Sequence, residues 1–124
     1  MRGVALWFFG SGVVYVTLGM FFGIWMSASQ DHTLAGAHAH LNLVGWVTMA
    51  LFGVYYHLVP AAAATTLAKV HFALATIGVW FMVPGIALVI QGQTEVPVVI
   101  GSFATAASML IFLFTVLRQR PAYA

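Results

Sequence analysis

The stretch VALWFFGSGVVYVTLGMFFGIWMS, at residues 4–27, contains no charged side chain. About 20 consecutive apolar residues are enough for an α-helix to cross the hydrocarbon core of a bilayer. The stretch also lacks the strict alternation of apolar and polar residues that is typical of a membrane β-strand. It therefore predicts a transmembrane helix.

Three further apolar runs follow, at residues 35–59, 67–90 and 96–117, and short segments rich in polar residues, glycine or proline separate them. Each run is long enough to cross a bilayer. We expect residues 1–124 to form a single transmembrane domain. Its fold class is all-α: an integral membrane four-helix bundle.

The composition supports a membrane protein, because 63% of the residues are hydrophobic and only 5% are charged. A soluble domain is about one quarter charged, so the sequence excludes a soluble globular domain. The chain contains no cysteine. This excludes disulfides, thiolate metal sites and covalent haem attachment through a C-x-x-C-H motif.

The few charges indicate how the chain crosses the membrane. Four spans place both termini and the second loop on one side, and the first and third loops on the other. The positive-inside rule puts the cationic side in the cytoplasm, which predicts a multi-pass protein of the inner membrane with both termini cytoplasmic. The same rule accounts for the net charge of +2, so the excess of cations does not indicate a nucleic-acid partner. All four cations obey the rule and both acids lie opposite: Arg2, Lys69, Arg118 and Arg120 against Asp31 and Glu95.

The five histidines are the candidate functional residues, since ionisable side chains within a membrane are costly and are usually functional. His32 lies in the first outer loop, and we expect it to be solvated. His38 and His40 lie at the outer start of the second helix, whereas His57 and His71 lie near the inner side. At 1.5 Å per residue, the two groups are separated by roughly 25 Å.

His38 and His40 are two positions apart, so in a regular helix they point about 200° away from each other. They cannot then ligate the same metal ion, and one is expected to face the bundle while the other faces outward. Which one does so stays open. A haem iron needs only one or two protein ligands, because the porphyrin supplies the other four.

The second run resembles a known family. The segment that opens with Ala37-His38-Ala39-His40-Leu41-Asn42 and closes with Leu58-Val59-Pro60 resembles the second transmembrane helix of haem–copper oxidase subunit I, in particular the nitric oxide reductase large subunit. His40-Leu41-Asn42 matches the H-x-N pattern of that helix. The resemblance implies that His40 is an axial ligand of a haem b near the outer membrane face, with His38 as the alternative and Asn42 at the site.

The chain also departs from that family. The family builds its oxygen- or nitric-oxide-reducing binuclear centre from histidines on later helices, and this chain lacks those helices. We therefore expect no such centre in this chain alone, and whether the protein is an enzyme stays open. The resemblance implies a haem protein for electron transfer with respiratory-chain partners, or for sensing a diatomic gas. The alternative is a cofactor-free structural or assembly subunit of a respiratory membrane complex.

The second axial ligand has two candidate sources. Met26, or the less well placed Met20, lies on the first helix at about the depth of His40. Alternatively, a two-fold homodimer brings His40 of each chain to one shared haem, and two-fold dimers are the commonest oligomers. Gly19-x-x-x-Gly23 permits close helix approach and gives weak support to a dimer face.

The inner histidines allow two interpretations. His57 and His71 lie at similar depth across a short connection, so they could form a second haem site or contact a quinone. The alternative is that they are interfacial residues that cap helix ends beside Tyr55 and Tyr56, as in an aromatic belt.

Overall fold

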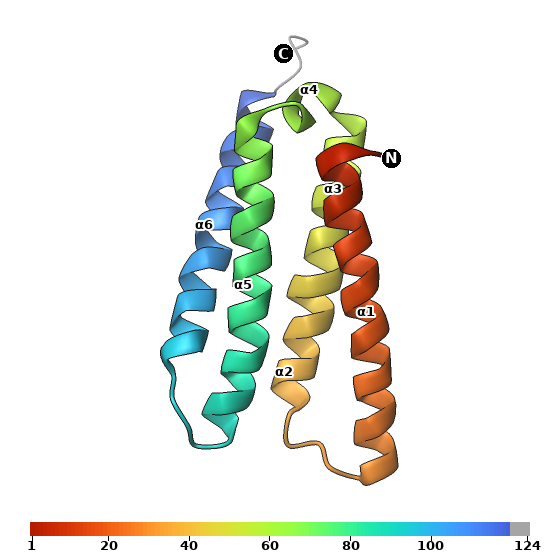
Figure 1. The fold of residues 1–124 in the computed structure, drawn as a ribbon, viewed down its shortest axis with the longest axis vertical. Coiled ribbons are helices and arrows are strands. Elements are labelled where there is room, and N and C mark those ends of the chain that lie inside the picture. Colours follow the sequence, from red (N-terminus) through yellow and green to blue (C-terminus); the bar gives the residue numbers. More distant parts are fainter. Residues whose placement is uncertain (120–124) are drawn as a thin grey trace.

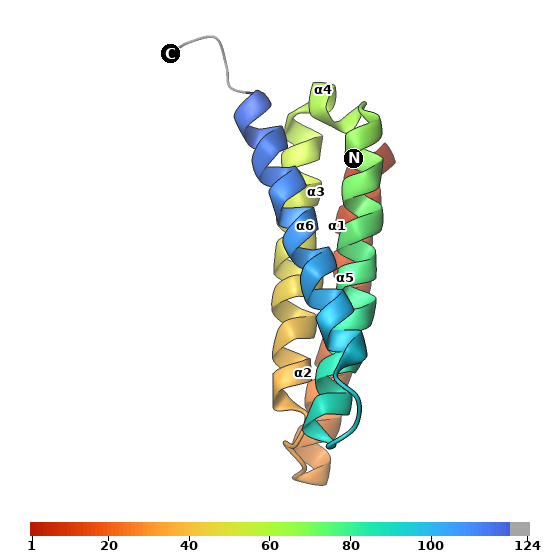
Figure 2. The same ribbon diagram turned by 90° about the vertical axis from the view of Figure 1, so that its left-hand side faces the viewer.

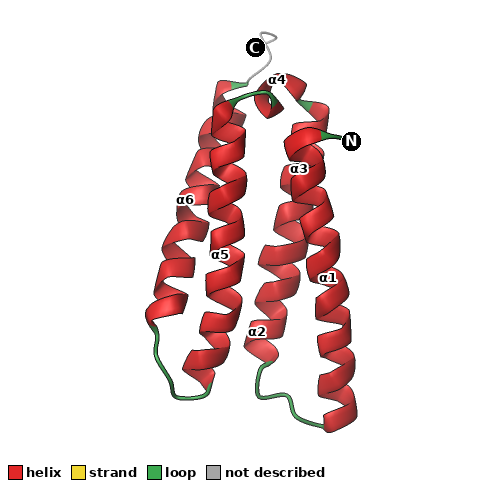
Figure 3. Ribbon diagram, viewed as in Figure 1, coloured by secondary structure: helices red, strands yellow, loops and turns green. Residues whose placement is uncertain are grey.

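The computed structural model describes residues 1–119, which form helices joined by short turns (Figures 1 and 3). The second long helix is continuous but consists of three pieces with different hydrogen bonding. The helices are α1 (Gly3–Ser29), α2 (Ala35–His40), η1 (Leu41–Thr48), α3 (Met49–Leu58), α4 (Pro60–Ala63), α5 (Thr66–Ile90) and α6 (Val96–Arg118).

Within residues 1–119, four helices are long and apolar enough to cross a membrane: Gly3–Ser29, Ala35–Leu58, Thr66–Ile90 and Val96–Arg118. The all-α architecture is therefore confirmed for these residues, and the four predicted spans correspond to helices with the length and composition of membrane spans. Large apolar side chains cover the outside of the helices. Phe103 is 74% exposed, Leu58 72% and Phe21 67%, as expected of a surface that lies against lipid.

The four spans form two antiparallel hairpins that lie side by side (Figures 1 and 2). One hairpin pairs α1 with α2, η1 and α3, and the other pairs α5 with α6. Helix α5 also packs against the first hairpin, so it joins the two halves of the bundle.

The charged residues lie at opposite ends of the bundle. The loops that contain Asp31 and Glu95 lie at one end, and the start of α1, α4 and the end of α6 lie at the other (Figure 1). The second end carries the described cations: Arg2, Lys69 and Arg118. The predicted separation of charge is therefore confirmed for the described residues, and Arg120 lies outside them.

Helix α1 contacts its partner along a narrow seam. Between Ala5 and Gly19 its buried residues recur with alternating spacings of three and four, the pattern of helices that pack nearly antiparallel with interlocking side chains. Small residues bring the backbones close, and a Cβ added at Gly12 would lie 3.2 Å from the Trp46 ring. The seam includes Ala5, Phe8, Gly12, Tyr15, Gly19 and Met26.

Helices α5 and α6 approach each other through glycines. A Cβ on Gly101 would overlap the backbone of Met82, and a Cβ on Gly85 would overlap the backbone of Val98. Only glycine permits such contacts, because backbone atoms cannot move aside as the end of a flexible side chain can.

The second span departs from the single regular helix that the apolar run predicts. Leu41–Thr48 forms a π-helix, and the Thr48 hydroxyl donates a 2.8 Å hydrogen bond to the Leu43 carbonyl, five residues earlier. Such wide turns are rare and occur often at functional sites. This one begins directly after His40.

Candidate functional site

The loop before α2 is held by a short polar turn. The Asp31 carboxylate accepts hydrogen bonds from the Thr33 hydroxyl, at 2.5 Å, and from the Thr33 amide, at 3.0 Å. These bonds hold the pKa of Asp31 below its usual value. His32 is exposed in the same loop, in agreement with the expected solvated position.

His38 faces helix α1. Its Nε2 lies 3.0 Å from the carbonyl oxygen of Gly19, and the amide nitrogen of Asn42 lies 3.2 Å from the same Nε2. A carbonyl oxygen only accepts hydrogen bonds and an amide nitrogen only donates them, so Nε2 of His38 makes one of these two hydrogen bonds, either as donor to Gly19 or as acceptor from Asn42. In either case Nε2 is occupied by contacts within the chain, next to α1 and η1.

The glycines of α1 make room for these two side chains. A Cβ added at Gly19 would overlap the Asn42 side chain, and one added at Gly23 would lie 3.1 Å from Nε2 of His38. The Gly19-x-x-x-Gly23 motif therefore packs within the chain. Its use as support for a dimer face was wrong, because the close approach that it permits is already occupied by α2 and η1.

His40 lies on the other side of α2 and is exposed. Its Nδ1 lies 2.8 Å from the carbonyl oxygen of Gly36, so Nδ1 is the protonated nitrogen. Nε2 of the neutral ring then keeps its lone pair. Metal-ligating histidines usually have this arrangement, in which the second ring nitrogen donates to a carbonyl or carboxylate.

The predicted opposite facing of the two histidines is therefore found, with His38 inside and His40 outside. Asn42 lies with His38 and not with His40, so the H-x-N pair does not form one contiguous group. The side-chain oxygen of Asn42 is buried and has no hydrogen-bond partner in the part of the chain that the structure describes.

Met26 lies on the His38 side of the bundle. It is only 5% exposed, and it follows Phe22 by one turn of α1, where the Phe22 ring contacts the His38 ring with centroids 5.6 Å apart. His40 is on the exposed side of α2. The structure thus does not bring Met26 and His40 together.

A second histidine site lies in the core, near the other end of the bundle. His71 is fully buried, and its Nδ1 lies 2.9 Å from the Tyr56 hydroxyl. The rings of Phe52, Phe8 and Phe112 surround it, with centroids at 4.5, 4.8 and 5.7 Å. Among residues 1–119, Nε2 of His71 has no hydrogen-bond partner. We call these five residues the aromatic cluster.

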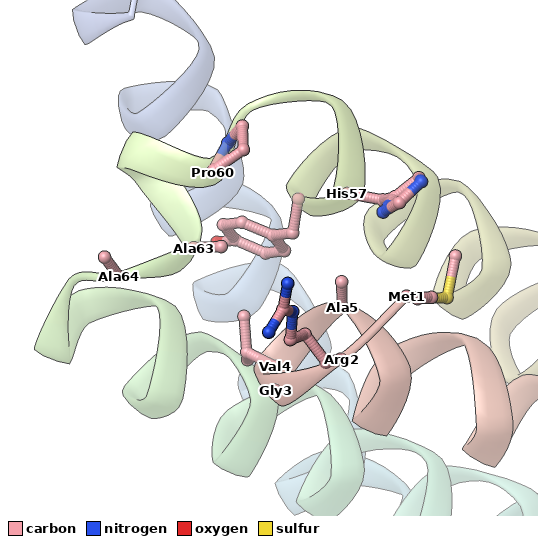
Figure 4. A pocket seen from close by; sticks show the side chains of 10 residues that line it. Met1, Arg2, Gly3, Val4, Ala5, His57, Pro60, Ala63 and Ala64 are labelled. Carbon is pink, nitrogen blue, oxygen red and sulfur yellow. The ribbon is translucent and has the colours of Figure 1, made fainter.

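His57 and His71 do not meet. His57 is exposed near the end of α3 and lines a pocket with Arg2 (Figure 4), whereas His71 is enclosed in the aromatic cluster. The interpretation of His71 as an interfacial cap is wrong, because this residue has no exposed surface. The residue that sequence reasoning missed is Tyr56, which was considered only as part of an aromatic belt.

A polar contact between the hairpins was also missed. The Trp80 indole N–H donates a 3.0 Å hydrogen bond to the Tyr15 hydroxyl and so joins α5 to α1. No sequence signal pairs these residues, which are far apart in the chain. Tyrosine and tryptophan in membranes commonly satisfy their polar atoms in this way.

Comparison of the chain with protein-family models, curated proteins and solved structures finds no match. Among residues 1–119, no group of three or more His, Cys, Asp or Glu side chains is arranged to hold a metal ion. A haem site does not require such a group, because one or two axial ligands are enough.

Proposed function

We propose that the protein is a small b-type haem protein of the inner membrane, in which the His40 side chains of two chains ligate one haem. The observation that carries the proposal is the hydrogen bond from Nδ1 of His40 to the Gly36 carbonyl. It fixes the tautomer whose Nε2 lone pair is available to iron. Haem supplies a one-electron iron couple that suits electron transfer to respiratory-chain partners or the sensing of a diatomic gas.

The contacts of the two outer histidines favour His40 over His38. Nε2 of His38 lies within hydrogen-bond distance of the Gly19 carbonyl and the Asn42 amide, so ligation through that atom would give up contacts within the bundle. Nε2 of His40 loses no protein contact. The resemblance of residues 37–60 to the haem-ligating helix of haem–copper oxidases points to the same residue.

The position of His40 on the outer surface supports a site shared between two chains. Met26, the intrachain candidate for the second ligand, is buried, whereas His40 is exposed. In a two-fold dimer the same surface of each chain meets its copy, which would bring two His40 side chains together. The positive-inside rule places this site near the outer face of the membrane.

The decisive experiment is a reduced-minus-oxidised spectrum of the purified protein and its histidine variants. We expect a sharp b-type α-band in the wild type and in His32→Ala, which is exposed outside the site. His40→Ala should lose most or all of the bound haem. His38→Ala should retain haem, because that side chain is used within the bundle.

Two results would contradict the proposal. Full haem occupancy in His40→Ala would reject this residue as the ligand. A wild-type protein that is colourless after expression with an ample haem supply would favour the cofactor-free assembly subunit. Expression with added haem precursor separates a true absence from limited supply.

A further inference from the structure

A pocket of the described chain lies at the end of the bundle opposite His40. It has a volume of about 360 Å³ and lies between the start of α1, the end of α3 and α4 (Figure 4). The ionisable side chains that line it are those of Arg2, His57 and Tyr56. Pro60 and Ala63 of α4 line another part of it. The haem proposal makes no use of this pocket.

The backbone at the start of α1 adds uncapped hydrogen-bond donors. The N–H groups of the first helical turn have no partner within the helix, and α1 has neither a side-chain cap nor an acidic residue in that turn. Val4 and Ala5 line the pocket and are only 5% and 2% exposed. The first turn of α1 therefore offers backbone N–H donors at the wall of the pocket, where an acceptor can bind.

The charges around the pocket are of one sign. Arg2 carries a permanent positive charge, the helix dipole adds a partial positive charge at the same place, and neutral or protonated His57 supplies an N–H donor. Asp31 and Glu95, the only acidic side chains of the sequence, lie at the other end of the bundle (Figure 1). The pocket therefore favours an anion.

We propose that this pocket binds the phosphate group of an anionic phospholipid headgroup. Phosphate oxygens match both an arginine guanidinium and the N–H groups of a helix start. The pocket adjoins surface that suits acyl chains, since Leu58 next to His57 is 72% exposed and Leu6 next to Ala5 is 49% exposed. A cationic membrane-proximal surface attracts anionic lipids in the same way.

The test is calorimetric titration of the full-length protein in a non-ionic detergent. The probes are dihexanoyl phosphatidylglycerol, dihexanoyl phosphatidylcholine and inorganic phosphate. We expect the anionic lipid to bind at least tenfold more tightly than the zwitterionic lipid. Arg2→Gln should weaken it about tenfold, the loss typical of one charge-assisted contact. Lys69→Gln is the matched control, because it removes a cation from the same end without touching the pocket, and it should bind like the wild type.

Each outcome has a defined meaning. Binding of inorganic phosphate as tight as that of the lipid, with the same loss in Arg2→Gln, supports a phosphate site that free phosphate fills. Equal binding of both lipids, or equal losses in Arg2→Gln and Lys69→Gln, overturns the proposal. The far-UV circular dichroism and haem content of Arg2→Gln should equal those of the wild type, which separates this test from that of His40.

Discussion

Tyr56 and His71 form a hydrogen bond inside a cluster of aromatic rings. The 2.9 Å contact between the Tyr56 hydroxyl and Nδ1 of His71 lies among the phenylalanine rings of the aromatic cluster. Nε2 of His71 already lacks a hydrogen-bond partner among the described residues. Removing the hydroxyl would leave both ring nitrogens of a fully buried imidazole without a hydrogen bond. A buried polar group without a partner lowers the stability of the fold by more than the net loss of an ordinary hydrogen bond.

We therefore expect Tyr56→Phe to lower the free energy of unfolding by about 1–3 kcal/mol. Thermal unfolding in detergent, followed by circular dichroism, measures the change as a lower Tm. Tyr55→Phe is the matched control, since no hydrogen bond is found for the Tyr55 hydroxyl among the described residues, and its effect should stay within about 0.5 kcal/mol. Equal effects of the two variants would show that the bond to His71 contributes nothing.

His38 and His40 show how far the sequence predicts a site. Their two-residue separation predicted that the two side chains lie on opposite sides of the helix, and the structure shows this arrangement. The sequence did not predict which one faces inward, because that depends on the rotation of the helix about its axis. Here the rotation is set by contacts with Gly19 and Gly23 of α1, which no periodicity of residues 35–59 reveals.

At the scale of the helices, the contact between α5 and α6 depends on glycine. A Cβ on Gly101 would overlap backbone atoms of Met82, so the two helices would have to separate. We expect Gly101→Ala to destabilise the protein by about 1–3 kcal/mol, as overpacking typically does. The measurement is the same detergent melt.

Gly10→Ala is the matched control for this prediction. Gly10 is also within a long helix, but a Cβ there would meet nothing within 4 Å. Alanine favours a helix over glycine by roughly 0.5–1 kcal/mol, so this variant should be neutral or slightly more stable. A Gly101→Ala protein as stable as Gly10→Ala would contradict the close packing of α5 and α6.

The helices themselves were predicted closely from apolar runs alone. The run at residues 67–90 corresponds to Thr66–Ile90, and the run at 96–117 corresponds to Val96–Arg118. The π-helix Leu41–Thr48 was not predicted, because a wide turn changes hydrogen bonding and not hydropathy. The Tyr56–His71 pair was missed for a related reason. It joins α3 to α5 across α4, and sequence spacing carries no information on such contacts.

At the scale of the whole molecule, the separation of charge predicts an orientation. The end that carries Arg2, Lys69 and Arg118 should lie in the cytoplasm. Reporter fusions after Ala124 and in the 61–66 connection should both report a cytoplasmic position, and a fusion in the loop with Glu95 should report the outer side. An outer position for either of the first two fusions would overturn this orientation.

The shared haem predicts a link between cofactor content and assembly. If His40 of each of two chains ligates one iron, saturated protein should contain about one haem per two chains. A ligand that binds only the dimer stabilises it by mass action, so removal of haem should shift the protein towards monomer. Sedimentation velocity of the haem-loaded wild type and of His40→Ala measures this shift, with His32→Ala as the control that should remain dimeric. One haem per chain in a monomer would instead require a second ligand from the same chain and would return Met26 to consideration.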